Sequence, residues 1–192
     1  MAHNDQEIEI KLRLSYKEYK RIKEELKKIT KFVKFSHHID EYFTPRHKSF
    51  LQPKYPYEWL TLRHRDDKVL LNYKHWYPEN TPNTTHCDEY ETQVLDGKQL
   101  KSILRALNFK KFVTVEKKRA TYVYKDGLEI ALDEVKDLGY FIEIETIKDF
   151  GDLKKARVAI FKFARKLGLY KTTTIPGGYG AELMRKKGLL TS

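Results

Sequence analysis

The amino-acid sequence predicts an α+β fold in which about eight β-strands form a sheet that curls or closes, with helices packed on its outer face. Two observations carry this prediction. Segments in which polar and apolar residues alternate recur along the chain and are separated by turn residues, which is the pattern of strands. Segments with apolar residues at helical spacing stand between them, and their apolar stripes need a sheet face to pack against. With 192 residues, the chain is expected to form a single domain, residues 1–192.

Composition limits the class of partner. Lysine and arginine number 38 against 27 aspartates and glutamates, so the formal net charge is +11. This balance favours an anionic partner: nucleic acid, an acidic membrane surface or a highly phosphorylated small molecule. The single cysteine, Cys87, excludes a disulfide framework and a cysteine-rich zinc site. The first residues lack a signal-peptide pattern and no apolar run approaches the roughly 20 residues that span a bilayer, so we expect a cytoplasmic protein with no membrane partner.

The first predicted strand, residues 7–14, reads Glu-Ile-Glu-Ile-Lys-Leu-Arg-Leu. Successive side chains point to opposite faces of a strand, so one face is charged and the other carries only isoleucine and leucine. A helix is predicted to follow, because Ser15 and Glu18 have the spacing of a capping box. Its apolar stripe consists of Tyr19, Ile22, Leu26 and Ile29.

The remaining elements follow from the same two periodicities. Strands are predicted at residues 38–43, 59–65, 69–76, 87–95, 113–124, 128–135 and 140–147. Helices are predicted at residues 98–107, 152–167 and 181–186, the first of them with a stripe of Leu100, Ile103, Leu104 and Leu107. Asp66-Asp67 predicts a hairpin turn, and Gly168 is placed to end the second of these helices.

Charged residues recur on one face of strand after strand. The acids are Glu7, Glu9, Glu89, Glu91, Asp133, Glu143 and Glu145, and the bases are Lys11, Arg13, Arg63, Arg65, Lys74, Lys117 and Arg119. In any single strand, a solvated outer face would give the same pattern. Across the set, however, Glu-x-Glu occurs three times, and like charges on one face repel unless a cation or a base lies between them. If the helices cover the apolar face, the charged face lines the inside, where it must bind water, ions or a ligand.

The two kinds of charge suit phosphoryl chemistry. Clustered carboxylates supply the hard oxygen ligands that Mg²⁺ or Mn²⁺ prefers. Arginine and lysine match phosphate oxygens, arginine bidentately. Phosphoryl transfer needs mainly positioning and charge stabilisation, and a face of this composition offers both.

Several blocks of the sequence resemble the CYTH superfamily, which groups class IV adenylyl cyclases, thiamine triphosphatases and inorganic triphosphatases. Residues 7–11 match its Glu-x-Glu-x-Lys signature, and four further blocks follow in the family's order over nearly the whole chain. They are Leu62-Arg63-His64-Arg65, Leu71-Asn72-Tyr73-Lys74, Glu116-Lys117-Lys118-Arg119, and Leu132-Asp133-Glu134-Val135 with Leu138-Gly139-Tyr140-Phe141-Ile142-Glu143-Ile144-Glu145. The sequence of the last block resembles that of the class IV cyclase branch. Gly178-Tyr179 differs from the Ser-Tyr pair of that branch.

The resemblance implies a closed eight-stranded antiparallel β-barrel, a tunnel that holds a triphosphate and one or two divalent cations. It assigns the metal to Glu7, Glu9, Asp133, Glu143 and Glu145, and the triphosphate to Lys11, Arg63, Arg65, Lys74, Lys117 and Arg119. Lys11, Lys74 and Arg119 are the expected catalytic residues. The expected reaction is conversion of ATP to cyclic AMP and pyrophosphate, with Mg²⁺ or Mn²⁺ as cofactor.

Three other functions stay open at this point. The same site would serve a triphosphatase that hydrolyses inorganic tripolyphosphate or thiamine triphosphate, and it would equally serve a silent triphosphate-binding domain. A nucleic-acid-binding module is the rival outside the family; the net charge favours it, but the carboxylates interleaved with the basic residues would repel a phosphate backbone. We therefore expect a small-molecule triphosphate as partner, no specific nucleic acid, and a possible homodimer.

Overall fold

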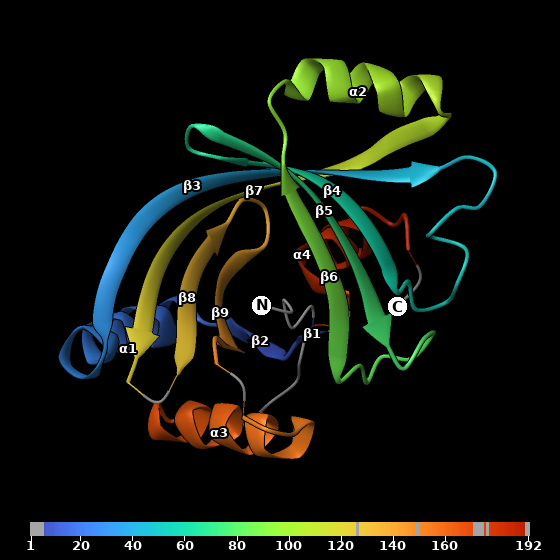
Figure 1. The fold of residues 1–192 in the computed structure, drawn as a ribbon. Helices are drawn as coiled ribbons and strands as arrows, with labels where there is room; N and C mark the ends of the chain where they lie inside the picture. The colour runs from blue at the N-terminus through green and yellow to red at the C-terminus, as the bar shows by residue number, and fades with distance from the viewer. Residues whose placement is uncertain (1–5, 126, 149, 171–174, 176, 191–192) are drawn as a thin grey trace. The chain divides into compact units, whose positions relative to one another are not determined.

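The computed structural model describes residues 6–125, 127–148, 150–170, 175 and 177–190, with the side chains of Gln6 and Glu7 outside the described part. Its elements follow one another as shown in Figure 1. They are β1 (Gln6–Glu7), β2 (Glu9–Leu14), α1 (Tyr16–Ile29), β3 (Lys31–Pro45), β4 (Glu58–Arg65), β5 (Lys68–Tyr77), β6 (His86–Gln93), α2 (Gly97–Ala106), β7 (Phe109–Tyr124), β8 (Leu128–Val135), β9 (Gly139–Thr146), α3 (Leu153–Lys166) and α4 (Gly178–Lys186). None of the helices in these ranges is long and apolar enough to cross a membrane.

The strands form one hydrogen-bonded sheet in the order β1-β6-β5-β4-β3-β7-β8-β9-β2. Apart from the two-residue β1, eight strands of six residues or more belong to it within the described ranges. The predicted α+β class and antiparallel sheet are confirmed, and every predicted helix is present. The structure corrects the first strand, because the chain leaves the strand conformation at Ile8 and splits the predicted segment into β1 and β2.

The chain divides into two compact units. The first unit comprises Met1–Gln6, His37–Glu116 and Pro176–Ser192, and the second comprises Glu7–Ser36 and Lys117–Ile175. Strands β3 and β7 contribute residues to both.

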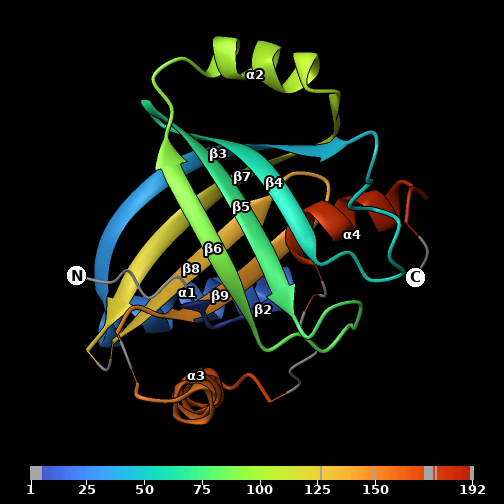
Figure 2. The same cartoon turned by 45° about the vertical axis from the view of Figure 1, so that its right-hand side comes forward.

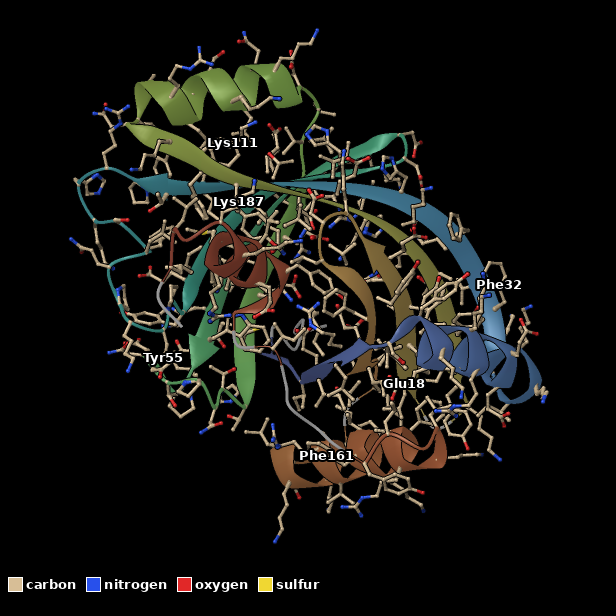
Figure 3. The ribbon with its side chains drawn as sticks, turned by 180° about the vertical axis from the view of Figure 1, so that it is seen from behind. Glu18, Phe32, Tyr55, Lys111, Phe161 and Lys187 are labelled. Carbon is tan, nitrogen blue, oxygen red and sulfur yellow. The ribbon has the colours of Figure 1, made fainter. Side chains whose placement is uncertain are left out.

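In the second unit, helices α1 and α3 pack against β2 and β9 (Figure 1). The apolar faces of β2, β8 and β9 form a core with the buried stripes of the two helices, which include Ile22 and Leu26 from α1 and Ile160 and Phe163 from α3. The predicted capping box starts α1: Glu18 Nα donates to Ser15 Oγ, and Ser15 N donates to the Glu18 carboxylate (Glu18 is labelled in Figure 3). This arrangement fixes the apolar face of the sheet toward the helices, so the alternate residues of the strands carry the charges on the other face.

In the first unit, β4, β5 and β6 form an antiparallel ladder (Figure 2). The predicted hairpin joins β4 to β5 through Asp66, whose positive φ of 51° suits a tight turn. Helix α4 lies against Tyr42 of β3. A Cβ at Gly180 would lie 2.9 Å from the Tyr42 ring, so only glycine permits this close approach.

The structure corrects the predicted packing of α2. The helix forms, with Asp96 as its N-cap. Of its predicted stripe, Leu104 is buried and the partly buried Leu100 packs against the same cluster. Ile103 and Leu107 are 53% and 60% exposed. Helical spacing shows which residues share a face, but it does not show how much of that face a neighbouring element covers.

Candidate functional site

Three carboxylates of the second unit converge on the charged face of its sheet. The register of β2 and β9 places Glu9 opposite Glu145 and Lys11 opposite Glu143, so all four side chains share one face. Carboxylate oxygens of Glu9, Glu143 and Glu145 lie within 4.8 Å of one another. Oxygen ligands from three carboxylates are the donors that Mg²⁺ and Mn²⁺ prefer, so this group fits a divalent cation.

Lys11 lies between two members of this group. Its Nζ is 3.1 Å from Glu9 Oε1 and 3.0 Å from Glu143 Oε2. The ammonium group offsets part of the repulsion between the glutamates. Three of the five predicted metal ligands therefore come together, with a predicted phosphate-binding lysine on them.

Asp133 and Arg119 form a second ion pair on the same face of this unit. Arg119 binds Asp133 bidentately, through Nε–Oδ1 at 2.8 Å and Nη2–Oδ2 at 2.7 Å, and Nη2 also donates to Glu143 Oε2 at 2.8 Å. Lys117 Nζ lies 3.8 Å from Asp133 Oδ2. Burial alone would raise the pKa of Asp133, but the charges of Arg119 and Lys117 outweigh it and lower the pKa. Asp133 thus stays ionised and orients Arg119.

The remaining predicted metal ligands differ from the group of three. Asp133 is fully buried against Arg119 and is not a member of that group. Glu7 lies in β1, and its side chain is outside the described part of the chain. The metal-binding roles of both residues stay predictions.

Glu129 is a carboxylate of this face that the sequence reasoning missed. It lies opposite Glu145 in the register of β8 and β9, and it shares its strand face with Asp133. Burial and the charge of Glu143 raise the pKa of Glu129. The alternation of residues 128–135 places it on the charged face, so the signal to find it was present in the sequence.

The first unit has a charged group of its own on β4, β5 and β6. Arg63 Nη1 lies 3.0 Å from Glu89 Oε1 and 2.7 Å from Glu91 Oε2. The buried Asn72 donates to the same two carboxylates at 2.6 and 3.2 Å, and Lys74 Nζ is 3.6 Å from Glu89. The structure therefore brings together two of the predicted triphosphate-binding residues, each held by a carboxylate.

Arg65, the third predicted basic residue of this unit, pairs with a residue of β3. Its Nη1 is 2.6 Å from Oδ1 of Asp40, a buried aspartate that the sequence reasoning did not assign to the charged face. Asp40 lies opposite Arg63 in the β3–β4 register, which places all three side chains on one face. Only the pairing of β3 with β4 identified Asp40 as the partner of Arg65.

The neighbouring Glu41 points to the opposite face, where two lysines and one histidine surround its carboxylate. Its carboxylate lies 3.0 Å from Lys111 Nζ, 3.1 Å from Lys101 Nζ of α2 and 3.2 Å from His64 Nε2 (Lys111 is labelled in Figure 3). Burial alone would raise the pKa of Glu41, but the hydrogen bonds from Lys111, Lys101 and His64 outweigh it and lower the pKa to about 2. This group ties α2 to β3, β4 and β7.

Comparison with known proteins identifies the family. The model of the CYTH domain matches residues 5–179. The chain belongs to the CYTH family. This CYTH domain is similar to a Methanocaldococcus jannaschii protein that is provisionally named an adenylate cyclase, with 28% identity over 175 residues, 90% of this chain and 95% of the other.

Solved structures agree with the family assignment. A Pyrococcus horikoshii protein shares 26% identity and superposes with a TM-score of 0.74, covering 91% of this CYTH domain and 98% of the other chain. A Hippeastrum protein provisionally named an adenylyl cyclase has a TM-score of 0.66 at 17% identity and covers 97% of each chain, so it shares the fold. The resemblance inferred from the sequence motifs is confirmed.

Proposed function

We propose that this CYTH protein binds ATP together with Mg²⁺ or Mn²⁺ and converts it to cyclic AMP and pyrophosphate. The observation that carries the proposal is the convergence of Glu9, Glu143 and Glu145 beside Lys11 and Arg119. A polyanion could not bind next to three carboxylates alone, whereas a divalent cation held by them would attract it. The similarity to the Methanocaldococcus jannaschii protein, whose name is that of an adenylate cyclase, supports the choice of reaction.

In the proposed reaction, the ribose 3′-oxygen attacks the α-phosphorus. A bond forms between them, the bond from the α-phosphorus to the bridging oxygen of the β-phosphate breaks, and pyrophosphate leaves with that oxygen. The 3′-hydroxyl proton passes to water. A bound cation would supply positive charge for the phosphate oxygens and favour the alkoxide.

The basic residues would position the phosphates. Arg119 presents its guanidinium while Asp133 holds it bidentately, so little side-chain freedom would be lost when a phosphate binds. Lys117 and Lys11 would add charge on the same face of the second unit. Arg63, Arg65 and Lys74 of the first unit are proposed to bind phosphate oxygens as well, since a charge-assisted hydrogen bond is the strong kind that an anion can form.

Hydrolysis of a terminal phosphate is the second candidate. The Hippeastrum protein, which shares the fold, is described as having a dominant triphosphatase activity. Hydrolysis uses the same cation and the same basic groups, with a water molecule in place of the 3′-hydroxyl. The two reactions therefore differ in which phosphorus the nucleophile reaches.

Product analysis tests the proposal. The protein would be incubated with ATP, and in parallel with inorganic tripolyphosphate, each with Mg²⁺, with Mn²⁺ and with excess chelator. We expect cyclic AMP and pyrophosphate from ATP, little turnover of tripolyphosphate, and no product in chelator. Orthophosphate from tripolyphosphate without any cyclic nucleotide would assign the protein as a triphosphatase. Binding of ATP without turnover under either metal would assign it as a silent triphosphate-binding domain.

A further inference from the structure

A row of three glutamates crosses adjacent strands of the second unit. The β2–β9 register places Glu9 opposite Glu145, and the β8–β9 register places Glu145 opposite Glu129. Residues that face each other in antiparallel strands point to the same side of the sheet and lie about 4.5–5.5 Å apart at Cβ. The three carboxylates therefore stand side by side, with Glu145 in the middle.

The neighbouring row of the same face is balanced differently. It consists of Lys11 on β2, Glu143 on β9 and Ala131 on β8. Lys11 and Arg119 both contact Glu143, so that carboxylate has two cationic partners. Ala131 brings no charge next to Glu129. The charges of Arg119 and Lys34 act on Glu129 without forming an ion pair with it, and burial outweighs them.

Glu129 itself forms no ion pair or hydrogen bond within the ranges that the structure describes. It is half-buried, on a strand whose other residues are mostly buried. Like charges placed opposite each other in a sheet destabilise it. Glu129 stands at the end of such a row without an ion pair to a described base. Its charge therefore lowers the stability of the metal-free fold and raises the affinity of the row for a cation.

We propose that Glu129 is a fourth carboxylate of the cation centre, and that it contacts the bound cation through a water molecule. The inference rests on the proposed function, in which Glu9, Glu143 and Glu145 hold the cation. Glu129 is not a member of the group whose oxygens lie within 4.8 Å of one another, which assigns it the outer position. Mg²⁺ and Mn²⁺ take about six ligands and usually keep several waters. Three carboxylates therefore leave room for a bound water that donates a hydrogen bond to a fourth carboxylate.

The role of such a residue is to raise affinity for the cation. Residues that hydrogen-bond the ligands or waters of a metal typically change its affinity about 10- to 100-fold when they are replaced. Glu129 adds a negative charge near the site in addition to an acceptor. It should therefore affect loading of the cation more than any step that follows loading.

The test is a titration with Mn²⁺ in the absence of nucleotide, measured by calorimetry and by the electron paramagnetic resonance signal of free Mn²⁺. Wild type is compared with Glu129→Gln, which removes the charge at nearly constant volume, and with Glu129→Asp, which keeps it. Glu134→Gln is the matched control, because Glu134 is exposed and lies on the other face of the same strand. Far-UV circular dichroism establishes that each variant is folded.

We expect Glu129→Gln to bind Mn²⁺ about 10- to 100-fold more weakly than wild type, Glu129→Asp to fall between them, and Glu134→Gln to match wild type. Equal affinity in folded Glu129→Gln and wild type would overturn the inference, as would the absence of Mn²⁺ binding in wild type. Mn²⁺ binding that is weakened by Glu129→Gln, in a protein that turns over neither ATP nor tripolyphosphate, would support the role of Glu129 while the proposed function fails.

Discussion

The charged groups of the two units are built from the same residue types but differ in balance. Among the described side chains of the second unit, five acids share the face with four bases: Glu9, Glu129, Asp133, Glu143 and Glu145 with Lys11, Arg13, Lys117 and Arg119. In the first unit, three acids face three bases: Asp40, Glu89 and Glu91 against Arg63, Arg65 and Lys74. The net negative group of the second unit attracts a cation. In the neutral group of the first unit, ion pairs orient the basic side chains, which can bind an anion.

Apart from the buried Asp40 and the exposed Arg13, the group of the first unit is also the more exposed. Asp133 is fully buried and Glu143 and Lys117 are 7% exposed, whereas the side chains of Arg63 and Glu91 are 20% and 36% exposed. Loss of one partner leaves an uncompensated charge, and that charge costs more where water is excluded. Substitutions in the second unit should therefore have the larger effects.

The largest effect on stability is expected for Asp133→Asn. The amide cannot balance Arg119 and Lys117, so the free energy of unfolding should fall by about 3–5 kcal/mol at neutral pH. Because the folded-state pKa of Asp133 lies below its ordinary value of 3.8, the stabilisation is fully present above that pH and is lost as the pH falls further. Urea unfolding at pH 7 and near pH 3 measures both. An equal loss in the exposed control Glu134→Gln would contradict the assignment.

Glu9→Gln should have the largest effect on activity. It removes one ligand charge of the group of three at nearly constant volume, so turnover should fall on the order of 10²- to 10³-fold while the protein stays folded. Initial rates over a range of Mn²⁺ concentrations, with circular dichroism of the same sample, measure this. Full activity of the variant, or of wild type in excess chelator, would show that these carboxylates hold no catalytic cation.

Arg63→Met tests the first unit with an intermediate effect. One charge-assisted hydrogen bond contributes about 1.5–3 kcal/mol to the binding free energy. Without it, the affinity for the triphosphate should fall roughly 10- to 100-fold. Arg46→Met, at an exposed arginine, is the control. The dissociation constant for ATP with metal decides between them. If Arg63 serves only to pair Glu89 and Glu91, the variant would lose stability but keep its affinity for ATP.

The smallest effect is expected for Glu41→Gln, on the other face of the first unit. The hydrogen bonds from Lys111, Lys101 and His64 lower the pKa of Glu41 to about 2, which corresponds to ~1–2 kcal/mol of stability after allowance for solvent screening. This contribution is present above the ordinary value of 4.5 and is lost as the pH falls toward 2. Thermal unfolding at pH 7 and pH 3 should show it, with ATP turnover unchanged. A loss of turnover at pH 7 in the folded variant would contradict this and would show that residues of this face take part in the reaction.

The sequence alone determined which residues share a face. The alternation of residues 7–14 placed Glu9 and Lys11 together, the capping box at Ser15 started α1, and the order of the charged blocks indicated the CYTH family. These are local properties, because the two-residue period of a strand and the hydrogen bonds of a helix start depend on residues close in the chain.

Only the tertiary structure decided which of these residues are neighbours. Asp133, whose metal-binding role stays a prediction, pairs with Arg119. Asp40 pairs with Arg65, and Glu129 lies in one row with Glu9 and Glu145. Each of these pairings joins different strands, and their register is set by the packing of the apolar faces and the turns between strands. A periodic pattern fixes the side of the sheet on which a charge lies, while the distance to its partner depends on which strand lies alongside and in which register.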